Sequence, residues 1–289
     1  MHTASAMSRK KKNRNKGKKQ KPKGPPQASV SDRHVLYQQS VQNVEAEIDF
    51  VDDTFKALRG RHATLLREDF CGTAHTSCEW IKRRATNRAI GVDLDSSVLE
   101  WGTTHNLDVL DADARGRVTL ERGDVTTIRT EPVDIVLAMN FSYFCFKSRE
   151  ALRGYFKNVL RSLADGGMLI MDCYGGAEAH LEQEEERDID GDFTYVWDQA
   201  KFDPISSHMI CHIHFHFDDG SKMRKAFSYD WRMWSLPEIR ELLEEAGFKK
   251  STVYWEGTDE EEEEGNGEFT AAEEGEADPA WIAYIVAEK

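Results

Sequence analysis

Two neighbouring segments carry the main evidence for the fold: residues 65–74 read LLREDFCGTA, and residues 88–95 read RAIGVDLD. Each contains a short apolar run, which is typical of a buried strand, and each reaches acidic residues just before a turn or a helix. Gly72 lies in the first of these turns, where the missing Cβ lets the backbone approach a ligand closely. The two segments therefore predict strands that end at a binding edge.

The alternation of strands and helices extends from these segments in both directions. Residues 30–58 have apolar side chains at three- and four-residue spacings, which predicts one or two helices before the sheet. Strands that alternate with helices form parallel βαβ units in a doubly wound sheet, and ligands bind at the carboxyl ends of such strands. The strands predicted in this half of the chain are 63–67, 88–94, 118–121, 133–139 and 168–173.

The pattern changes after residue 175. Residues 178–192 are polar and acidic, and the segments 193–197, 207–217 and 223–231 predict antiparallel strands with a hairpin turn at 218–221. A helix is expected at 235–246, and the last two strands at 250–255 and 281–287. Between those two strands, the segment 258–278 has eleven acidic residues and no basic one, so it predicts a disordered surface loop.

The charge of the chain is unevenly distributed. Residues 1–24 contain ten Lys or Arg and no acidic residue, which predicts a disordered basic tail at 1–28 before a folded domain at 29–289. The rest has 28 basic residues (38 − 10) against 52 acidic ones, a balance of −24 that repels nucleic acid. The tail alone could contact RNA, although a merely solvated tail is the simpler interpretation.

Cysteine usage and hydropathy indicate the compartment. The five cysteines have no paired-ligand spacing, which fits reduced thiols in a cytoplasmic protein better than disulfides or zinc. No apolar run approaches the length of a membrane span, and no secretory signal is visible at the basic start. We therefore expect a cytoplasmic location and no membrane partner.

Four motifs follow one another at the predicted strand ends, and no GxGxxG dinucleotide fingerprint is among them. In chain order they are Glu68 before Cys71-Gly72-Thr73, then Asp93-Leu94, then Asp124-Val125, then Asn140. In order and spacing they resemble the motifs of class I S-adenosylmethionine-dependent methyltransferases. Phe70 and Ala74 depart from the family pattern, because they replace glycines of the first motif. A bulky Phe70 would move the loop away from the cofactor, or let Asp69 rather than Glu68 face the ligand.

The resemblance implies S-adenosylmethionine as cofactor and assigns roles at each motif. Asp93 would accept the two ribose hydroxyls, and Asp124 would receive the adenine amino group. The alternatives are that Asp93 or Asp95 only caps the next helix and that Asp124 only stabilises a turn. The implied cofactor-binding residues are Glu68, Cys71, Gly72, Asp93, Leu94, Asp124, Val125 and Asn140.

Residues 229–248, which read YDWRMWSLPEIRELLEEAGF, resemble the small-molecule branch of the same family. The implied fold is α/β, with a doubly wound, mostly parallel seven-stranded sheet whose last strand is antiparallel. Residues 193–231 would form a β-hairpin lid insertion over the substrate. The implied function is methyl transfer to an O or N atom of a small molecule. The alternatives are an RNA methyltransferase that uses the basic tail, and a non-catalytic binding protein that keeps the fold.

Methyl transfer from a sulfonium is an in-line displacement, which requires positioning and desolvation rather than a nucleophile triad or a metal. A general base helps when the acceptor is a hydroxyl or an ammonium. Aromatic side chains such as Phe141, Trp231 and Trp234 either pack on a cationic group or belong to the core. The candidate bases, which the sequence does not rank, are Tyr143, Tyr174, His180, Tyr229 and Asp230.

Three alternating histidines, His212, His214 and His216, share one face of a predicted strand with His208. Such spacing can chelate a metal. Apart from Asp218 at the turn, no carboxylate has ligand spacing with them, so the histidines are better explained as the wet face of a half-buried hairpin. No metal site is predicted.

Overall fold

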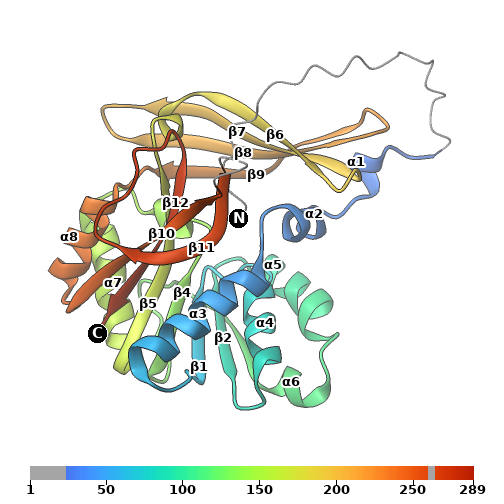
Figure 1. Cartoon of the computed structure of the whole chain (residues 1–289). Helices are drawn as coiled ribbons and strands as arrows, with labels where there is room; N and C mark the ends of the chain where they lie inside the picture. The colour runs from blue at the N-terminus through green and yellow to red at the C-terminus, as the bar shows by residue number, and fades with distance from the viewer. Residues whose placement is uncertain (1–23, 260–263) are drawn as a thin grey trace.

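The computed structural model describes residues 24–259 and 264–289. Within these residues the chain forms one eight-stranded and one four-stranded sheet (Figure 1). The strands of the large sheet are β1 (Leu65–Asp69), β2 (Arg88–Asp93), β3 (Val118–Arg122), β4 (Val133–Ala138), β5 (Leu163–Gly175), β10 (Lys250–Asp259), β11 (Glu264–Ala272) and β12 (Trp281–Glu288).

The large sheet has the order β11-β10-β12-β5-β4-β1-β2-β3. The five strands from β3 to β5 are parallel to one another, whereas β12 is antiparallel to both β5 and β10. This confirms the predicted doubly wound sheet with an antiparallel last strand. The sheet has an eighth strand among the described residues, because β11 pairs antiparallel with β10 at one edge.

The strand β11 corrects the expectation of a disordered loop at 258–278. Residues 264–272 form a strand, and the ring of Phe269 stacks on Tyr284 of β12 with centroids 4.1 Å apart. Phe269 also contacts Phe50, so one aromatic side chain attaches this acidic segment to the core. The acidic residues at 260–263 lie outside the described residues.

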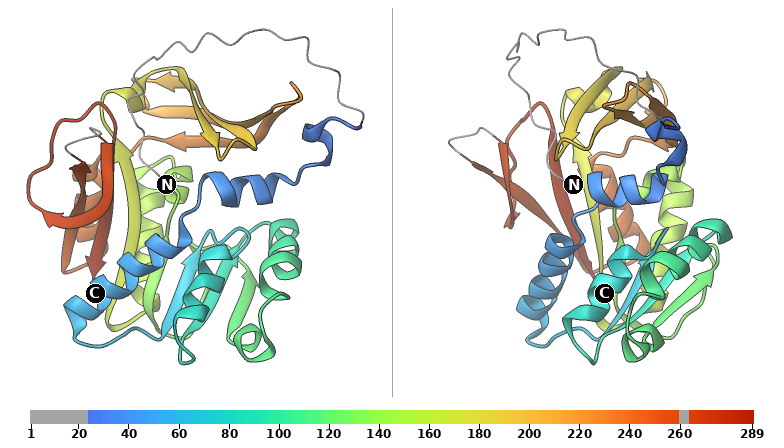
Figure 2. Two further views of the ribbon diagram at one scale, coloured as in Figure 1. Left: turned by 45° about the vertical axis from the view of Figure 1, so that its right-hand side comes forward. Right: turned by 90° about the vertical axis from the view of Figure 1, so that its right-hand side faces the viewer.

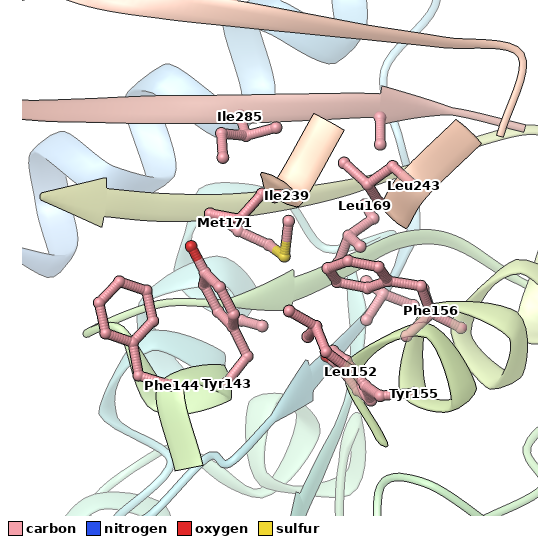
Figure 3. Packing of buried hydrophobic residues seen from close by; sticks show 14 of the residues in the cluster. Tyr143, Phe144, Leu152, Tyr155, Phe156, Leu169, Met171, Ile239, Leu243 and Ile285 are labelled. Carbon is pink, nitrogen blue, oxygen red and sulfur yellow. The ribbon is translucent and has the colours of Figure 1, made fainter. Parts of the chain in front are cut away.

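Helices cover both faces of the large sheet, and the pleat of the strands divides the core between them. Met168 and Ile170 of β5 pack with α3 (Val44–Arg59) and α4 (His75–Arg83). Leu169 and Met171 point the other way, toward α7 (Arg149–Ser162) and α8 (Leu236–Ala246), as Figure 3 shows. The shorter helical segments are α5 (Ser96–Gly102), η1 (Thr103–Leu107), α6 (Ala112–Gly116), η2 (Ser142–Cys145) and η3 (Glu178–His180).

The smaller sheet is an antiparallel meander that lies across the carboxyl ends of the parallel strands (Figures 1 and 2). Its strands are β6 (Gln183–Ile189), β7 (Phe193–Asp203), β8 (His208–Phe217) and β9 (Lys222–Arg232). The insertion is therefore wider than the expected 193–231, because the glutamate-rich β6 pairs with β7 along the edge. We call this four-stranded sheet the lid sheet.

An N-terminal arm, made of α1 (Gln27–Val30) and α2 (Arg33–Ser40), joins the lid sheet to the large sheet. The backbone N–H of Gln27 donates to Asp219 at the β8–β9 turn, 2.8 Å away. Because α1 begins at Gln27, the predicted disordered tail does not extend to residue 28. The basic residues of that tail, at 1–23, lie outside the described residues.

Candidate active site

The turn after β1 has three residues in the left-handed region of backbone conformation: Phe70 at φ 58°, Gly72 at φ 52° and Ala74 at φ 55°. Only glycine adopts this conformation without a steric cost, which is about 1–2 kcal/mol for other residues. The loop therefore keeps a glycine-like backbone shape although two glycines of the family pattern are replaced. Burial of the Phe70 ring against Phe146 and Tyr155, with centroids 6.1 and 5.8 Å away, offsets part of this cost.

Asp93, at the end of β2, joins the first motif to the second. One carboxylate oxygen accepts the backbone N–H of Gly72 and the other accepts the N–H of Asp95, both at 2.9 Å. Asp95, not Asp93, caps α5 by accepting the N–H of Ser97. Next to Asp93, the side chain of Leu94 is 65% exposed, so a large apolar surface lies open at this edge of the sheet.

Asp124 lies beside Asp93 because β2 and β3 are neighbours in register. The backbone N–H of Gly123 donates to the carbonyl of Asp93 at 3.0 Å. The Asp124 side chain is exposed, and one of its oxygens accepts both the N–H and the hydroxyl of Thr126. Its second oxygen accepts no hydrogen bond from the described residues, while the following Val125 is buried in the core. The turn-stabilising role is thus real, and it leaves one oxygen for a ligand.

The two acids of β1 are buried and bonded within the protein. Glu68 is 7% exposed and accepts the N–H and the hydroxyl of Ser77 at the start of α4, and burial raises its pKa to about 8. Asp69 is fully enclosed, where it pairs with Arg67 at 2.8 Å and accepts the hydroxyl of Tyr155 at 3.0 Å. Neither acid has the exposure of Asp93 or Asp124, so the cofactor role of Glu68 stays a prediction.

The turn after β4 contains a second strained segment. Asn140 and Phe141 are consecutive left-handed residues, at φ 59° and 54°. Both of their N–H groups donate to the buried carboxylate of Asp172 in β5, at 2.7 and 2.8 Å. Hydrogen bonds to a charged group contribute about 1.5–3 kcal/mol each, which is comparable to the cost of the two left-handed residues. Burial nevertheless raises the pKa of Asp172 to about 7.

Aromatic rings connect these strand ends to the lid sheet. Phe141 lies 4.6 Å from Tyr174 at the end of β5 and 6.4 Å from Trp231 of β9, between ring centroids. Trp231 in turn lies 4.4 Å from Tyr229 and 6.0 Å from Trp197. We call Phe141, Tyr174, Trp197, Tyr229 and Trp231 the aromatic wall. Tyr174, Trp197 and Tyr229 are only partly buried.

On the lid sheet, Glu184, Asp198 and His214 bring their possible ligand atoms within 4.8 Å of one another. The Nδ1 atom of His214 accepts the backbone N–H of Lys225 at 2.6 Å, so a neutral ring carries its proton on Nε2, 3.1 Å from Asp198. A metal on Nε2 would move that proton to Nδ1, against another N–H donor. This arrangement disfavours a metal ion at the cluster.

Comparison with known proteins agrees with this geometry. Residues 69–171, from the end of β1 into β5, match the family model described as a methyltransferase domain. Over these residues the chain is a methyltransferase domain. The cofactor of class I methyltransferases is S-adenosylmethionine, and the elements that resemble their binding motifs lie at one edge of the sheet. No curated protein matches the sequence.

Solved structures of methyltransferases share the fold over nearly their whole length. A S-adenosylmethionine-dependent methyltransferase from Clostridium acetobutylicum has a TM-score of 0.63 at 15% identity, over 88% of this chain and 96% of its own. CalS10, an amino pentose methyltransferase from Micromonospora echinaspora, has a TM-score of 0.63 at 17% identity, over 88% and 95%. KedS8, a sugar N-methyltransferase from Streptoalloteichus, has 0.60 at 14%, over 98% and 99%.

The candidate bases lie in three different environments in the structure. Tyr143 is fully buried and donates its hydroxyl to the carbonyl of Asp172, so it anchors η2 instead of facing an acceptor. His180 and Asp230 are exposed at the surface, where Asp230 pairs with Lys147 and His208. Tyr174 and Tyr229 belong to the aromatic wall. Burial raises the pKa values of both hydroxyls well above the ordinary range, so they remain neutral.

Sequence reasoning missed two contributions to the site. The arm helix α2 reaches the first motif, where the Gln38 amide donates to the hydroxyl of Thr73 at 2.9 Å. Asp172 was also missed, although a carboxylate inside the apolar run MLIMDCY is itself a signal that a buried polar contact is needed. Within the described residues, no helix of the methyltransferase is both long and apolar enough to cross a bilayer.

Proposed function

We propose that the methyltransferase transfers the methyl group of S-adenosylmethionine to the amine nitrogen of a small polar molecule. The acceptor binds between the carboxyl ends of β4 and β5 and the lid sheet. The observation that carries this proposal is the aromatic wall, which connects the strand ends with the lid sheet and leaves three of its five rings partly exposed.

The proposed cofactor position follows the order of the strands. Asp93 receives the ribose hydroxyls, and the open surface of Leu94 packs against the adenine, whose amino group donates to Asp124. Gly72 brings the loop backbone close to the methionine end, together with Cys71 and Asn140, whereas Val125 stays beside Asp124 at the adenine. The exposure of Leu94 and the free oxygen of Asp124 support this orientation.

An amine acceptor fits the wall better than an acid does. Aromatic faces attract cations and offer nothing to a carboxylate, and the wall is neutral because its tyrosines are protonated. Three structurally similar enzymes are named for related substrates: an amino pentose, a sugar nitrogen and a glycopeptide nitrogen. Because the lid sheet lies across the strand ends, it covers the proposed site, which fits a small acceptor better than a large one.

The chemical step needs little from the protein beyond placement. The cofactor supplies an electrophilic methyl group on a sulfonium leaving group. The lone pair of the neutral amine forms the new C–N bond as the S–C bond breaks, and the methylated ammonium then loses a proton to water. The wall excludes water from the reacting atoms and stabilises the developing ammonium, while a Tyr174 or Tyr229 hydroxyl accepts a hydrogen bond from it.

The alternative that the enzyme uses its basic tail to methylate RNA stays a prediction, since residues 1–23 lie outside the described residues. The tail is tested separately from the site. If residues 1–23 matter only for RNA, then deleting them leaves transfer to a small amine within about twofold and removes RNA binding in a filter assay.

The acceptor class is tested with radiolabelled S-adenosylmethionine and matched pairs of methyl aminopentosides and methyl pentosides. We expect label in the amine of the first compound and none in its hydroxyl counterpart. Trp197→Leu should raise the acceptor KM about tenfold, because it removes one ring of the wall. Trp255→Leu is the matched control: Trp255 packs on Trp281 of the large sheet, with ring centroids 5.0 Å apart, and is not one of the five residues of the wall. Transfer only to hydroxyls, or equal effects of the two variants, would overturn the proposal.

A further inference from the structure

The segment Asn140–Tyr143 is held by one residue of the neighbouring strand. Asp172 accepts the N–H groups of Asn140 and Phe141 through its carboxylate, and the hydroxyl of Tyr143 through its backbone carbonyl. The carboxylate receives each N–H on a different oxygen. We call this set of three hydrogen bonds the Asp172 clasp. Figure 3 shows Tyr143 in the core beside Met171, with its hydroxyl directed toward β5.

The backbone that the clasp holds is unfavourable by itself. Two consecutive left-handed residues are rare, and Phe141 is bulkier than the residues that usually adopt this conformation. Consecutive N–H groups that converge in this way form a concave site for an anion, which the Asp172 carboxylate occupies. Without that carboxylate the turn would lose the interaction that selects its conformation.

The clasp positions the side chain of Phe141, which lies between the carboxyl ends of the parallel strands and the lid sheet. Phe141 is 4% exposed and contacts Tyr174 of β5 as well as Trp231 of β9. A change of φ at Phe141 would move this ring away from one of the two contacts. The position of the Phe141 ring between these two contacts therefore depends on Asp172.

We propose that Asp172 is a positioning residue for methyl transfer: its carboxylate fixes the Asn140–Phe141 turn and thereby the Phe141 ring of the aromatic wall. Asp172 touches neither cofactor nor acceptor in this proposal. The inference rests on the proposed function for its kinetic test, whereas its structural test needs no acceptor.

Asp134 provides a matched control at the opposite end of the sheet. It is a second buried carboxylate that accepts consecutive backbone N–H groups, those of Thr64 at 2.8 Å and Leu65 at 3.2 Å. Asp134 stands at the start of β4, far from the strand ends that carry the motifs. Asp134→Asn thus makes the same substitution at a buried, backbone-bonded carboxylate remote from the site, where it also weakens the ion pair with Arg61.

The primary variant is Asp172→Asn, because an amide presents one acceptor oxygen where the carboxylate presents two. One of the two N–H groups then meets an NH₂ donor. We expect kcat with the methyl aminopentoside to fall about 30- to 100-fold, while the Kd for S-adenosylhomocysteine changes less than threefold. Asp134→Asn should lower the melting temperature but keep kcat within twofold.

A second variant and a second measurement cover the case in which Asp172→Asn folds poorly. Tyr143→Phe removes only the third bond of the clasp and should lower kcat about three- to tenfold. Amide hydrogen exchange at Asn140 and Phe141 should accelerate at least tenfold in Asp172→Asn. This measurement decides the clasp's role even if the aminopentoside is not the acceptor.

Three outcomes would overturn the inference: unchanged exchange at both amides in Asp172→Asn, an unchanged kcat despite faster exchange, or an equal loss of kcat in Asp134→Asn. A loss of more than 100-fold in Tyr143→Phe, which keeps both bonds to the carboxylate, would also overturn it. In contrast, absence of transfer to any amine by the unaltered enzyme would refute the proposed acceptor and leave the exchange result to decide the clasp.

Discussion

Substitution of Asp93 by Asn is the sharpest test of where the cofactor binds. The two oxygens of Asp93 already accept the N–H groups of Gly72 and Asp95, and we propose that they also receive the two ribose hydroxyls. An amide keeps the size of the side chain, but it removes the charge and turns one acceptor into a donor. One backbone N–H then faces that donor, and one ribose hydroxyl loses a charge-assisted bond.

Loss of one hydrogen bond to a charged group costs about 1.5–3 kcal/mol, which corresponds to a Kd about 10- to 150-fold weaker. Isothermal titration with S-adenosylhomocysteine measures this change directly. Asp95→Asn is the matched control, since it makes the same substitution two residues away and Asn caps helices as well as Asp does. A Kd within threefold of the unaltered protein for Asp93→Asn, or an equal loss for Asp95→Asn, would refute the assignment.

Three further predictions concern stability and metal binding. Gly102→Ala should lower the melting temperature by about 3–8 °C, because the new Cβ would lie 2.4 Å from the Thr73 carbonyl oxygen. Gly154→Ala in α7 should raise the melting temperature by about 2 °C, because the new Cβ meets nothing within 4 Å. Thermal scans compare the two variants. Glu68→Gln mimics the protonated acid of Glu68. Protonated Glu68 contributes its full share of the free energy of unfolding below pH 4.5, and this share is lost as pH rises through about 8. The variant should therefore melt several degrees higher than the unaltered protein at pH 9 and at the same temperature at pH 5. Finally, 100 μM zinc should shift the melting temperature by less than about 1 °C, because His214 has no free lone pair for it; a larger shift that EDTA reverses and His214→Ala abolishes would contradict the tautomer argument.

Most of the large sheet could be predicted because its determinants are local. Buried parallel strands are short apolar runs, and each is followed by a turn or cap residue, as in the segment from Arg88 to Asp95. Since parallel strands end at one edge, the order of the motifs also placed Asp93 and Asp124 at the same edge of the sheet. Their positions next to each other follow from the β2–β3 register.

The two acidic strands could not be predicted, because their composition is that of a solvated loop. β6 and β11 are edge strands, and charged side chains on an edge prevent pairing with other molecules while still permitting pairing with the neighbouring strand. What fixes β11 is Phe269, whose partners Tyr284 and Phe50 are distant in the sequence. Only the assembled core brings these rings together.

The candidate site also has one part that the sequence predicts and one part that depends on the tertiary structure. The sequence by itself determined which residues stand at the strand ends, because that depends on periodicity over a few neighbouring residues. Tertiary structure alone decided which donors these acids meet: Glu68 accepts from Ser77, Asp69 pairs with Arg67, and Asp93 accepts the N–H of Gly72. The physical reason is that a carboxylate is solvated by whatever donors surround it, and those donors come from elements that folding brings from elsewhere in the chain.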